Sequence, residues 1–329
     1  MKRQILQYLR EAEGIVSGEQ MSDRLGVSRV SVWKHIRSLQ AAGYPIASTP
    51  RGYQLNGRPD VLQPWEFPGR EGRIHCHDEV PSTMTIAREL ARQGCPEFTV
   101  VTAEQQTGGR GRLGRVWHSQ RGGLYFTIVL RPTLPSQLSS LTTFAAGLTW
   151  AQLLRKDYGI DAGLKWPNDL LVDERKLSGM LSELDARGEL VTFVNIGIGI
   201  NVNNDPTLKE PTAVSLAQLL GRKIDRSDLL QGFLDRFERK MTEERCLDNI
   251  IAEWKPLAVT MNRPVKIVTT RASIEGIARD VDETGALILE GPDGTRQRII
   301  HGDCFHQAGS DDPKNETDAD VPARRRDFK

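Results

Sequence analysis

At residues 109–115 the chain reads GRGRLGR, a stretch in which three arginines alternate with three glycines. Backbone amides left accessible by glycine and planar guanidinium groups can converge on one anion. The stretch has the form of the G-x-G-x-x-G dinucleotide fingerprint, but that fingerprint opens a helix and is followed about 20 residues later by an acid. Here the strand-like residues 124–130 (LYFTIVL) and then 131–134 (RPTL) follow. The stretch therefore predicts an anion-binding loop outside a dinucleotide fold.

The same loop does not fit the phosphate-binding P-loop. After Gly109 and Gly114 the chain continues with Arg115 and Val116, where that motif needs a lysine and a hydroxyl residue. From these residues alone, a solvated glycine turn with surface arginines is the alternative to an anion-binding loop.

Length and composition describe an ordinary soluble protein. With 329 residues, the chain is long enough for two or three domains with substantial cores. Hydrophobic residues make up 38% of it, no apolar run reaches about 18 residues, and the N-terminus lacks a positive-then-apolar signal pattern. We therefore expect a cytoplasmic protein that does not associate with a membrane.

The cysteines and histidines give no sign of a disulfide or metal framework. Cys76, Cys95, Cys246 and Cys304 show no paired spacing, and the chain has no export signal, so free thiols are expected. Residues 75–77 (HCH) hold metal-binding side chains, but no further ligands are near them in the sequence. We expect no metal there.

Charge is distributed unevenly along the chain, although the net charge is only +1. Residues 1–58 hold nine Lys or Arg against four Asp or Glu, a balance of +5, which can meet nucleic acid. Residues 309–329 have too little apolar content to offset the entropy of ordering, so a disordered tail is expected. The tail's residues 324–326 (RRR) could touch nucleic acid, but its six acids favour a solvated end.

The N-terminal segment has the pattern of a helix-turn-helix. Apolar residues recur at helical spacing over 5–9, residues 20–25 form a second helix that ends at Gly26, and Ser28 is a good N-cap for a third. Two short helices joined through a glycine are typical of this motif. The third helix would turn one set of residues inward, Val32, Ile36 and Leu39, and a second set outward, Arg29, Ser31, Trp33, Lys34 and Arg37.

Residues 44–55 (YPIASTPRGYQL) then predict two short strands around an exposed basic turn, as in the wing of a winged helix. We expect Arg29, Ser31 and Lys34 to approach bases or phosphates, and Arg51 to reach the DNA backbone or minor groove. Such a domain usually reads two half-sites as a dimer, because one module contacts too few base edges. A small helical docking module is the alternative.

Three further motifs follow the arginine loop: 165–170 (KWPNDL), 175–180 (RKLSGM) and 197–203 (GIGINVN). In this order and at these separations, the four segments closely resemble the biotin protein ligases, which adenylate biotin and transfer it to a lysine of a carrier protein. With the N-terminal segment, the resemblance is to the bifunctional bacterial form, a biotin ligase and biotin operon repressor in one chain. It covers residues 1–308.

The expected fold class is a multidomain α+β protein. Residues 56–59 (NGRP) begin a linker, and the region after it alternates strand-like and helical runs, which predicts a mixed sheet. Short β runs at 265–268, 273–277 and 286–289 predict a small C-terminal β-barrel, which is SH3-like in the ligases. The predicted limits are 1–58 for the winged helix-turn-helix domain, 59–64 for the linker, 65–260 for the ligase domain, 261–308 for the SH3-like domain and 309–329 for the tail.

Ser82 and Thr83 precede an expected helix over 85–92, so Ser82 could simply be an N-cap hydroxyl. In the ligases the matching hydroxyls hydrogen-bond the ureido ring of biotin, which suits a dry pocket. The resemblance also implies that Gln106 touches biotin, with Gln105 as the second choice.

The resemblance assigns the loop arginines to anions. Arg110 and Arg112 would hold the biotin carboxylate and the adenylate phosphate, and Arg115 the departing pyrophosphate; such contacts are worth roughly 1.5–3 kcal/mol each. Trp117 is either a core aromatic or a wall of the ligand pocket. Two glycines, Gly111 and Gly179, are assigned to the biotin site, and Gly179 suits close backbone approach.

Lys176 is the expected catalytic residue, because the matching lysine of the ligases lies beside the carboxylate and the α-phosphate. From the residues alone it follows a turn at 173–175 and could be a solvated hairpin lysine. Asn168 and Asp169 could form an Asx turn, but the resemblance places them at the nucleotide, with Asp169 as the Mg²⁺ contact. Asn201 is expected to face the nucleotide.

Residues 204–209 (NDPTLK) look like a flexible loop that covers the adenylate. Some relatives place an aromatic residue in this stretch, but positions 204–220 contain none, so the packing of the adenine stays open.

The expected activity is therefore the ATP-dependent formation of biotinyl-5′-AMP and the transfer of biotin to the biotin carboxyl carrier protein of acetyl-CoA carboxylase. The expected partners are Mg²⁺, the carrier, operator DNA and a second copy of the chain, with the adenylate as co-repressor. Two alternatives stay open: a lipoate-type ligase, and a repressor whose enzyme site has decayed. Retention of Arg110, Arg112 and Lys176 argues against decay.

Overall fold

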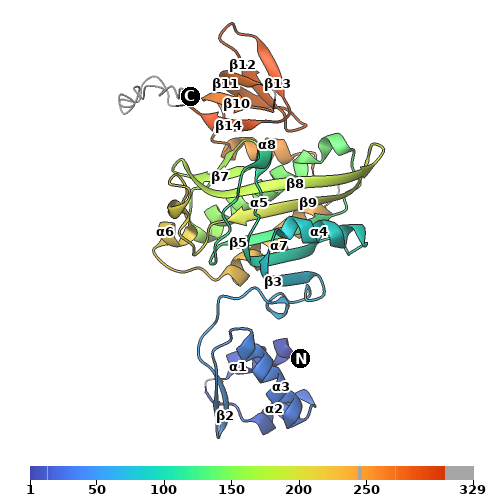
Figure 1. Ribbon diagram of the computed structural model, residues 1–329, viewed down its shortest axis with the longest axis vertical. Coiled ribbons are helices and arrows are strands. Elements are labelled where there is room, and N and C mark those ends of the chain that lie inside the picture. The colour runs from blue at the N-terminus through green and yellow to red at the C-terminus, as the bar shows by residue number, and fades with distance from the viewer. Residues whose placement is uncertain (13, 244–246, 271, 308–329) are drawn as a thin grey trace, which may run out of the picture.

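The computed structural model describes residues 1–12, 14–243, 247–270 and 272–307. Three parts follow one another along the long axis: a mainly helical N-terminal part, a central part built on a large sheet, and a small β part (Figure 1). The predicted tail at 309–329 and Cys246 lie outside the described residues. Cys76, Cys95 and Cys304 are free thiols, as expected.

The N-terminal part is the predicted winged helix-turn-helix. Its elements are α1 (Lys2–Glu11), α2 (Gly18–Leu25), α3 (Arg29–Ala41), β1 (Ile46–Thr49) and β2 (Gly52–Leu55), and β1 pairs antiparallel with β2 as the wing. The three helices bury a common apolar cluster, which includes Ile5, Leu6, Leu9, Met21, Val32, Ile36 and Leu39.

Capping residues set the boundaries of the turn. Ser17 and Gln20 form a reciprocal capping box at the start of α2, which satisfies backbone amides that have no helical partner. Gly26 ends α2 with φ 64°, a left-handed conformation that favours glycine. The hydroxyl of Ser28 accepts a hydrogen bond from the amide of Ser31 at 3.2 Å and so begins α3 as predicted.

The central part holds a seven-stranded sheet in the order β3-β4-β5-β9-β8-β7-β6. The strands β3 and β4 are parallel and the other neighbours are antiparallel, so the sheet is mixed, as the sequence predicted. The strand bounds are β3 (Ile74–Val80), β4 (Thr99–Gln106), β5 (Leu124–Leu130), β6 (Gly163–Lys165), β7 (Asp169–Val172), β8 (Arg175–Arg187) and β9 (Leu190–Ile200).

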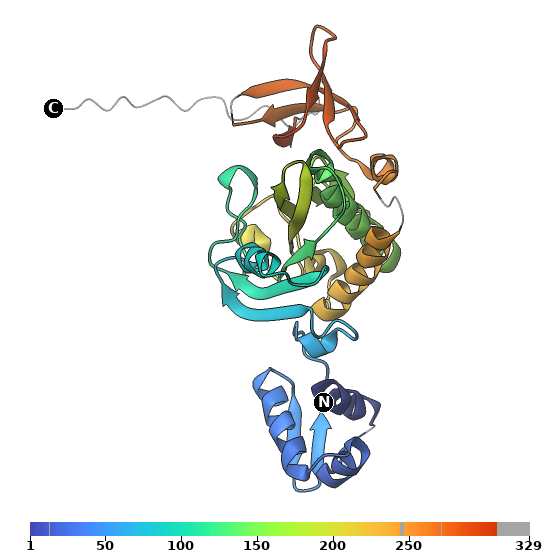
Figure 2. The same ribbon diagram turned by 90° about the vertical axis from the view of Figure 1, so that its right-hand side faces the viewer.

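Helices cover both faces of this sheet. Successive strand residues point to opposite sides, and apolar residues on each side are buried beneath helices. Val101 and Val129 pack beneath α4 (Thr83–Arg92), whereas their neighbours Val100 and Ile128 join the larger core beneath the other helices. That second layer contains α5 (Ser140–Tyr158), α7 (Arg226–Thr242) and α8 (Ile250–Trp254), and α5 packs against both of the others (Figure 2).

Short helical segments complete the central part. They are α6 (Leu216–Leu220) and the 3₁₀ turns η1 (Pro64–Glu66), η2 (Arg112–Gly114), η3 (Ser136–Leu138), η4 (Pro206–Leu208) and η5 (Lys255–Leu257). Among the described residues, no helix is both long and apolar enough to span a membrane.

The C-terminal part is a five-stranded antiparallel sheet in the order β13-β12-β11-β10-β14. Its strands are β10 (Pro264–Val268), β11 (Ser273–Val281), β12 (Leu287–Glu290), β13 (Arg296–Ile299) and β14 (Asp303–His306). The sequence predicted the first three, although β11 continues past a register shift at Ala278. It missed β13, whose first three residues are polar and exposed, and β14, which has only four residues.

Phe233 lies at the centre of an aromatic stack in the second layer. Its ring stacks on Trp150 at 4.4 Å and on Phe237 at 5.3 Å, and it is fully buried. Phe233→Ala should therefore lower the free energy of unfolding by about 3–5 kcal/mol, measured by urea denaturation. Leu208→Ala is the control, because Leu208 is 73% exposed and should change stability by less than about 0.5 kcal/mol. Equal effects would contradict the prediction.

Candidate active site

A cavity of about 350 Å³ lies where the arginine loop, the β7–β8 hairpin, β9 and β14 meet. This volume falls within the range of about 300–1,000 Å³ that is typical of small-molecule sites. The cavity is lined by every residue that the sequence assigned to biotin or the nucleotide: Ser82, Thr83, Gln106, Arg110, Gly111, Arg112, Arg115, Trp117, Asn168, Asp169, Lys176, Gly179 and Asn201.

One end of the cavity carries a connected set of neutral hydrogen-bonding groups. The amide of Thr83 donates to Oε1 of Gln106 at 2.8 Å, and the hydroxyls of Thr83 and Thr127 are 2.8 Å apart. Nε2 of Gln106 donates to the hydroxyl of Ser119 at 2.8 Å. These contacts fix the orientation of the Gln106 amide, so this end presents short donors and acceptors in a defined geometry.

The structure of Ser82 differs from one of the two interpretations that the sequence allowed. It occupies the N-cap position of α4, but its hydroxyl makes no capping hydrogen bond and its side chain is buried beside the cavity. The interpretation of Ser82 as a simple N-cap hydroxyl is therefore wrong. The second choice for the glutamine is also placed elsewhere: the side chain of Gln105 donates to Glu79 and does not line the cavity.

The floor of the cavity is β9, where two glycines leave room. A Cβ atom at Gly199 would lie 2.3 Å from Nε1 of Trp117, and one at Gly197 would lie 2.8 Å from Cε of Met84. The indole Nε1 of Trp117 is buried and has no hydrogen-bond partner. Trp117 thus packs closely on the sheet and lines the cavity at the same time.

The arginine loop folds back on itself rather than opening a helix. Arg110 and Val116 form an isolated antiparallel bridge, and the amide of Gly111 donates to the carbonyl of Arg115 at 2.8 Å. Only the single 3₁₀ turn η2 lies between them, with Leu113 at φ 49°. This conformation agrees with the exclusion of a dinucleotide fingerprint.

Acids from distant strands hold the loop arginines. Asp303 of β14 lies 3.0 Å from Nε of Arg115 and 3.9 Å from Nε of Arg112, while Glu183 of β8 lies 3.9 Å from Arg110. Burial lowers the pKa of the Arg112 guanidinium, and Asp303 only partly opposes this shift. The loop therefore presents three arginines to two acids, a net positive charge that favours an anionic ligand.

Lys176 is not a solvated hairpin lysine. The predicted turn is present, with Asp173 and Glu174 at positive φ, but Nζ of Lys176 lies 2.8 Å from Asp169 and 5.6 Å from the ring centroid of Trp117. Its amide donates to the carbonyl of Thr212 at 2.9 Å. These contacts direct the ammonium group into the cavity.

The asparagines predicted at the nucleotide are held by local contacts. The side chain of Asn168 donates to the carbonyl of Met180, so it joins the segment between β6 and β7 to β8 rather than forming an Asx turn. Asn201 is buried, and its Oδ1 accepts from Nδ2 of Asn204 at 3.0 Å. The expected covering loop continues from there as the turn η4, and Pro206 from it lines the cavity.

Several charged or aromatic lining residues were not assigned a role from the sequence, among them Lys165, Glu174, Asp303 and Phe305. Lys165 belongs to the KWPNDL motif, so its motif was a usable signal. Asp303 and Phe305 come from β14, which gave no local signal. Phe305 lies beneath the cations of Arg115, at 4.9 Å, and Lys165, at 5.9 Å. Phe305 thus supplies an aromatic side chain to the cavity wall, whereas positions 204–220 contain none.

The cavity holds one thiol, and a second cysteine lies in the HCH stretch. Burial raises the pKa of Cys304 to about 12 and that of Cys76 to about 11, so both stay protonated near neutral pH. Among the residues that the structure describes, no group of three or more His, Cys, Asp or Glu side chains could hold a metal ion.

The residues predicted to contact DNA lie in the N-terminal part, at the opposite end of the molecule from β14, which lines the cavity (Figure 1). Arg29, Ser31 and Lys34 are in the first turns of α3, and Arg51 is in the turn between β1 and β2. The arginines and Lys34 are exposed. Trp33 is 52% exposed on the same helix.

Comparisons with known proteins agree with this arrangement. Residues 77–201 match the biotin/lipoate A/B protein ligase family, residues 2–54 a helix-turn-helix domain, and residues 260–307 the biotin protein ligase C-terminal domain. A solved biotin protein ligase from Aquifex aeolicus, in complex with biotin and ATP, superposes with a TM-score of 0.60 at 29% identity, covering 72% of this chain and 99% of that one.

Curated relatives extend the match over nearly the whole chain. The bifunctional ligase/repressor BirA of Bacillus subtilis is 36% identical, covering 90% of this chain and 96% of the relative. The protein of the same name from Escherichia coli is 30% identical, covering 83% and 88%. With a biotin-ligase site in the centre and a winged helix-turn-helix at the N-terminus, this chain belongs to the family of bacterial bifunctional biotin ligase/repressor proteins.

Proposed function

We propose that the chain joins biotin to ATP, forming biotinyl-5′-AMP and pyrophosphate, and then transfers biotin to a lysine of the biotin carboxyl carrier protein of acetyl-CoA carboxylase. One observation carries the proposal: a single cavity has neutral hydrogen-bonding groups at one end and a cluster of cations at the other. A ligand with an uncharged polar ring and a carboxylate chain suits that polarity. The named relatives include biotin–[acetyl-CoA-carboxylase] ligases, one of them from Paracoccus denitrificans.

Biotin would lie along β9 in this site. Its ureido ring would bond Ser82, Thr83 and Gln106, which lie at the neutral end. Its ring system would lie over β9 against Trp117 and Met84, which line the cavity and pack on the backbone of Gly199 and Gly197. The carboxylate would then reach the cationic end, beside Arg110 and Arg112.

The first step needs positioning and charge stabilisation rather than a covalent enzyme group. A biotin carboxylate oxygen attacks the α-phosphorus of ATP, and the bond from that phosphorus to the bridging oxygen breaks as pyrophosphate leaves. Lys176, Arg110 and Arg112 stabilise the charge that develops on the transferring phosphoryl group. Arg115 would hold the pyrophosphate, while Asn168 and Asn201 border the nucleotide.

In the second step the neutral ε-amine of the carrier lysine attacks the carbonyl carbon of the adenylate. The carbon–oxygen bond to AMP breaks, AMP leaves, and the amine loses a proton as the amide forms. The phosphate charge of the leaving AMP would stay paired with the same cations, which stabilises its departure.

Mg²⁺ fits this site as an ion that arrives with the nucleotide. Mg²⁺ is usually held by one or two carboxylates together with substrate phosphates and water. Asp169 lines the cavity with its side chain 17% exposed and contacts Lys176, so it can serve as the protein ligand. Bound there, the ion would supply neutralisation of the phosphate oxygens.

The N-terminal part would bind operator DNA through Arg29, Ser31, Lys34 and Arg51. Phosphate contacts give affinity and base contacts give specificity. We propose biotinyl-5′-AMP as the co-repressor: it would order residues 108–117 and 203–212 and favour a homodimer that places two such domains on one operator. The proposed domain limits are 1–58 for the winged helix-turn-helix domain, 59–64 for the linker, 65–260 for the ligase domain and 261–308 for the SH3-like domain.

Replacing Gly199 by alanine tests the floor of the site. Because the added Cβ would overlap Trp117 at 2.3 Å, Gly199→Ala should weaken biotin binding at least about tenfold, measured by isothermal titration calorimetry. Gly232→Ala is the matched control in α7, where the Cβ would meet the flexible end of Arg236 at 3.3 Å and make an ordinary contact with Leu153 at 3.5 Å. Wild-type affinity in Gly199→Ala would contradict the placement of biotin on β9.

Removing the ammonium group tests the chemistry. Lys176→Ala should lower kcat for biotin-dependent pyrophosphate release about 100- to 1,000-fold, the usual loss for one group that stabilises a transition state. Labelling of a carrier domain should fall in parallel. Lys156→Ala is the control, because Lys156 is an exposed lysine of α5. If biotin elicits no pyrophosphate from the unsubstituted protein, the proposed activity is wrong.

Adenylate-dependent dimerisation is measured by sedimentation equilibrium, with and without biotinyl-5′-AMP. We expect the dimerisation constant to rise with the ligand, because ordering the two loops in advance lowers the entropy lost on association. Equal constants in the two conditions would exclude the adenylate as the dimerisation signal.

A further inference from the structure

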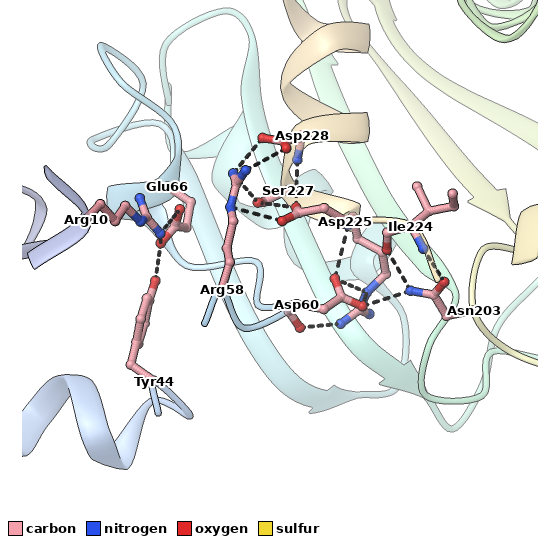
Figure 3. A network of polar contacts seen from close by, with 11 residues as sticks. Arg10, Tyr44, Arg58, Asp60, Glu66, Asn203, Ile224, Asp225, Ser227 and Asp228 are labelled. Atoms are coloured by element: carbon pink, nitrogen blue, oxygen red, sulfur yellow. Dashed lines mark hydrogen bonds and ion pairs between the residues drawn. The ribbon is translucent and has the colours of Figure 1, made fainter. Parts of the chain in front are cut away.

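A buried guanidinium joins the linker to the central part, and Figure 3 shows its linker partner Asp60 beside Asn203. Arg226, the first residue of α7, has a side chain only 4% exposed. Its Nε lies 2.8 Å from Asp60 and its Nη1 lies 2.9 Å from Glu104. Nη1 also donates to the carbonyl of Gly123 at 2.9 Å, and Nη2 to the carbonyl of Asp60 at 3.0 Å. A buried charge of this kind is stable only with such full pairing, so the linker residue Asp60 is fixed in place.

The carboxylate of Asp60 has a second partner. Nδ2 of Asn203 donates to it at 2.9 Å and to the carbonyl of Ile224 at 2.8 Å, while Oδ1 of Asn203 accepts from the amide of Ile224 at 2.9 Å. The amide of Asn203 donates to the carbonyl of Gly122 at 2.8 Å. The side-chain Nδ2 and Oδ1 of Asn203 and its backbone N–H therefore all have hydrogen-bond partners.

Asn203 stands between two residues of the cavity wall. Asn201 and Asn204 both line the cavity, and they are joined by the hydrogen bond from Asn204 to Asn201. Oδ1 of Asn204 accepts from the amide of Val202 at 3.0 Å. The polar contacts of Asp60 thus fix Asn203, and peptide bonds join Asn203 to Val202 and Asn204 at the proposed nucleotide side of the cavity.

Glu104 extends the same cluster toward the other end of the cavity. It lies on β4, which ends at Gln106, the residue placed at the ureido ring. Arg226 consequently touches, through one guanidinium, the linker and a strand that carries a ligand-binding side chain.

We propose that Asp60 and Arg226 are positioning residues of the ligase site. Through Asn203 they hold residues 201–204 in the geometry that binds the nucleotide, so the linker that carries the DNA-binding part is a component of the active site. This inference rests on the proposed function. By thermodynamic reciprocity, a nucleotide that favours this geometry also strengthens the attachment of the linker.

A second attachment, made by the residue that directly precedes the 59–64 linker, provides a control. Arg58 lies 3.0 Å from Asp225 and 2.5 Å from Asp228, at the start of α7. Neither acid contacts Asn203 in Figure 3, where the two attachments lie side by side. Removing Arg58 therefore loosens the linker from α7 without breaking the path to the cavity.

The experiment compares Asp60→Ala with Arg58→Ala in the full chain, by steady-state kinetics of biotin-dependent pyrophosphate release. Asp60→Ala should raise KM for ATP about tenfold, a factor that corresponds to about 1.4 kcal/mol, with kcat within about twofold of wild type. Arg58→Ala should leave KM for ATP within about twofold. Asp60→Asn keeps one acceptor oxygen for Asn203 and should restore KM in part, which a general loss of stability would not do.

A measurement on the unsubstituted protein covers the case in which Asp60→Ala does not fold. Amide hydrogen exchange at residues 58–62 should slow when ATP and biotin are added, because the ligands fix Asn203 and with it Asp60. Unchanged exchange at these residues, or equal effects of Asp60→Ala and Arg58→Ala on KM, would overturn the inference. Absence of pyrophosphate release by the unsubstituted protein would instead overturn the proposed function, and this inference with it.

Discussion

Concentrated positive charge is the constraint on which the rest of the site depends. Arg110, Arg112, Arg115, Lys165 and Lys176 all line one cavity, and like charges at such separations repel strongly in a medium of low dielectric constant. The fold meets this cost with acids from three different strands: Asp169 of β7, Glu183 of β8 and Asp303 of β14. A phosphate or carboxylate group of a substrate can replace these acids as the partner of the cations. The cations are therefore paired before the substrate binds and can still bind an anion.

This balance makes the C-terminal sheet part of the site rather than an appendage. Asp303 pairs with the arginine loop, and Glu174 of the β7–β8 turn pairs with Arg263 at 2.6 Å and with His306 at 3.2 Å. Burial alone would raise the pKa of Glu174, but its bonds to Arg263 and His306 outweigh burial and lower it. The hairpin that carries Lys176 is thus fastened to the C-terminal sheet. Contacts at the other end, through Arg226 and Asp60, attach the linker to the same central part.

Several features of the fold and the site followed from local sequence. Helical spacing and the caps Ser28 and Gly26 predicted the N-terminal helices, because capping and amphipathic periodicity act within a few residues. The predicted site motifs line one cavity, and each is a short segment whose glycines, turn residues and charges restrict its own conformation. The alternatives that failed were those in which a local interpretation competed with a long-range one: Ser82 as a cap, and Lys176 as a solvated hairpin residue.

The sequence by itself determined the order of the three parts, the mixed sheet, and the motif side chains that meet at the cavity. Only the tertiary structure decided which acid neutralises which cation. With 44 basic and 43 acidic residues in the chain, no local rule selects Asp303 for Arg115 or Asp60 for Arg226. Those choices arise when packing of the apolar core brings strands distant in sequence together and removes water from their charges, because burial then makes each pairing matter.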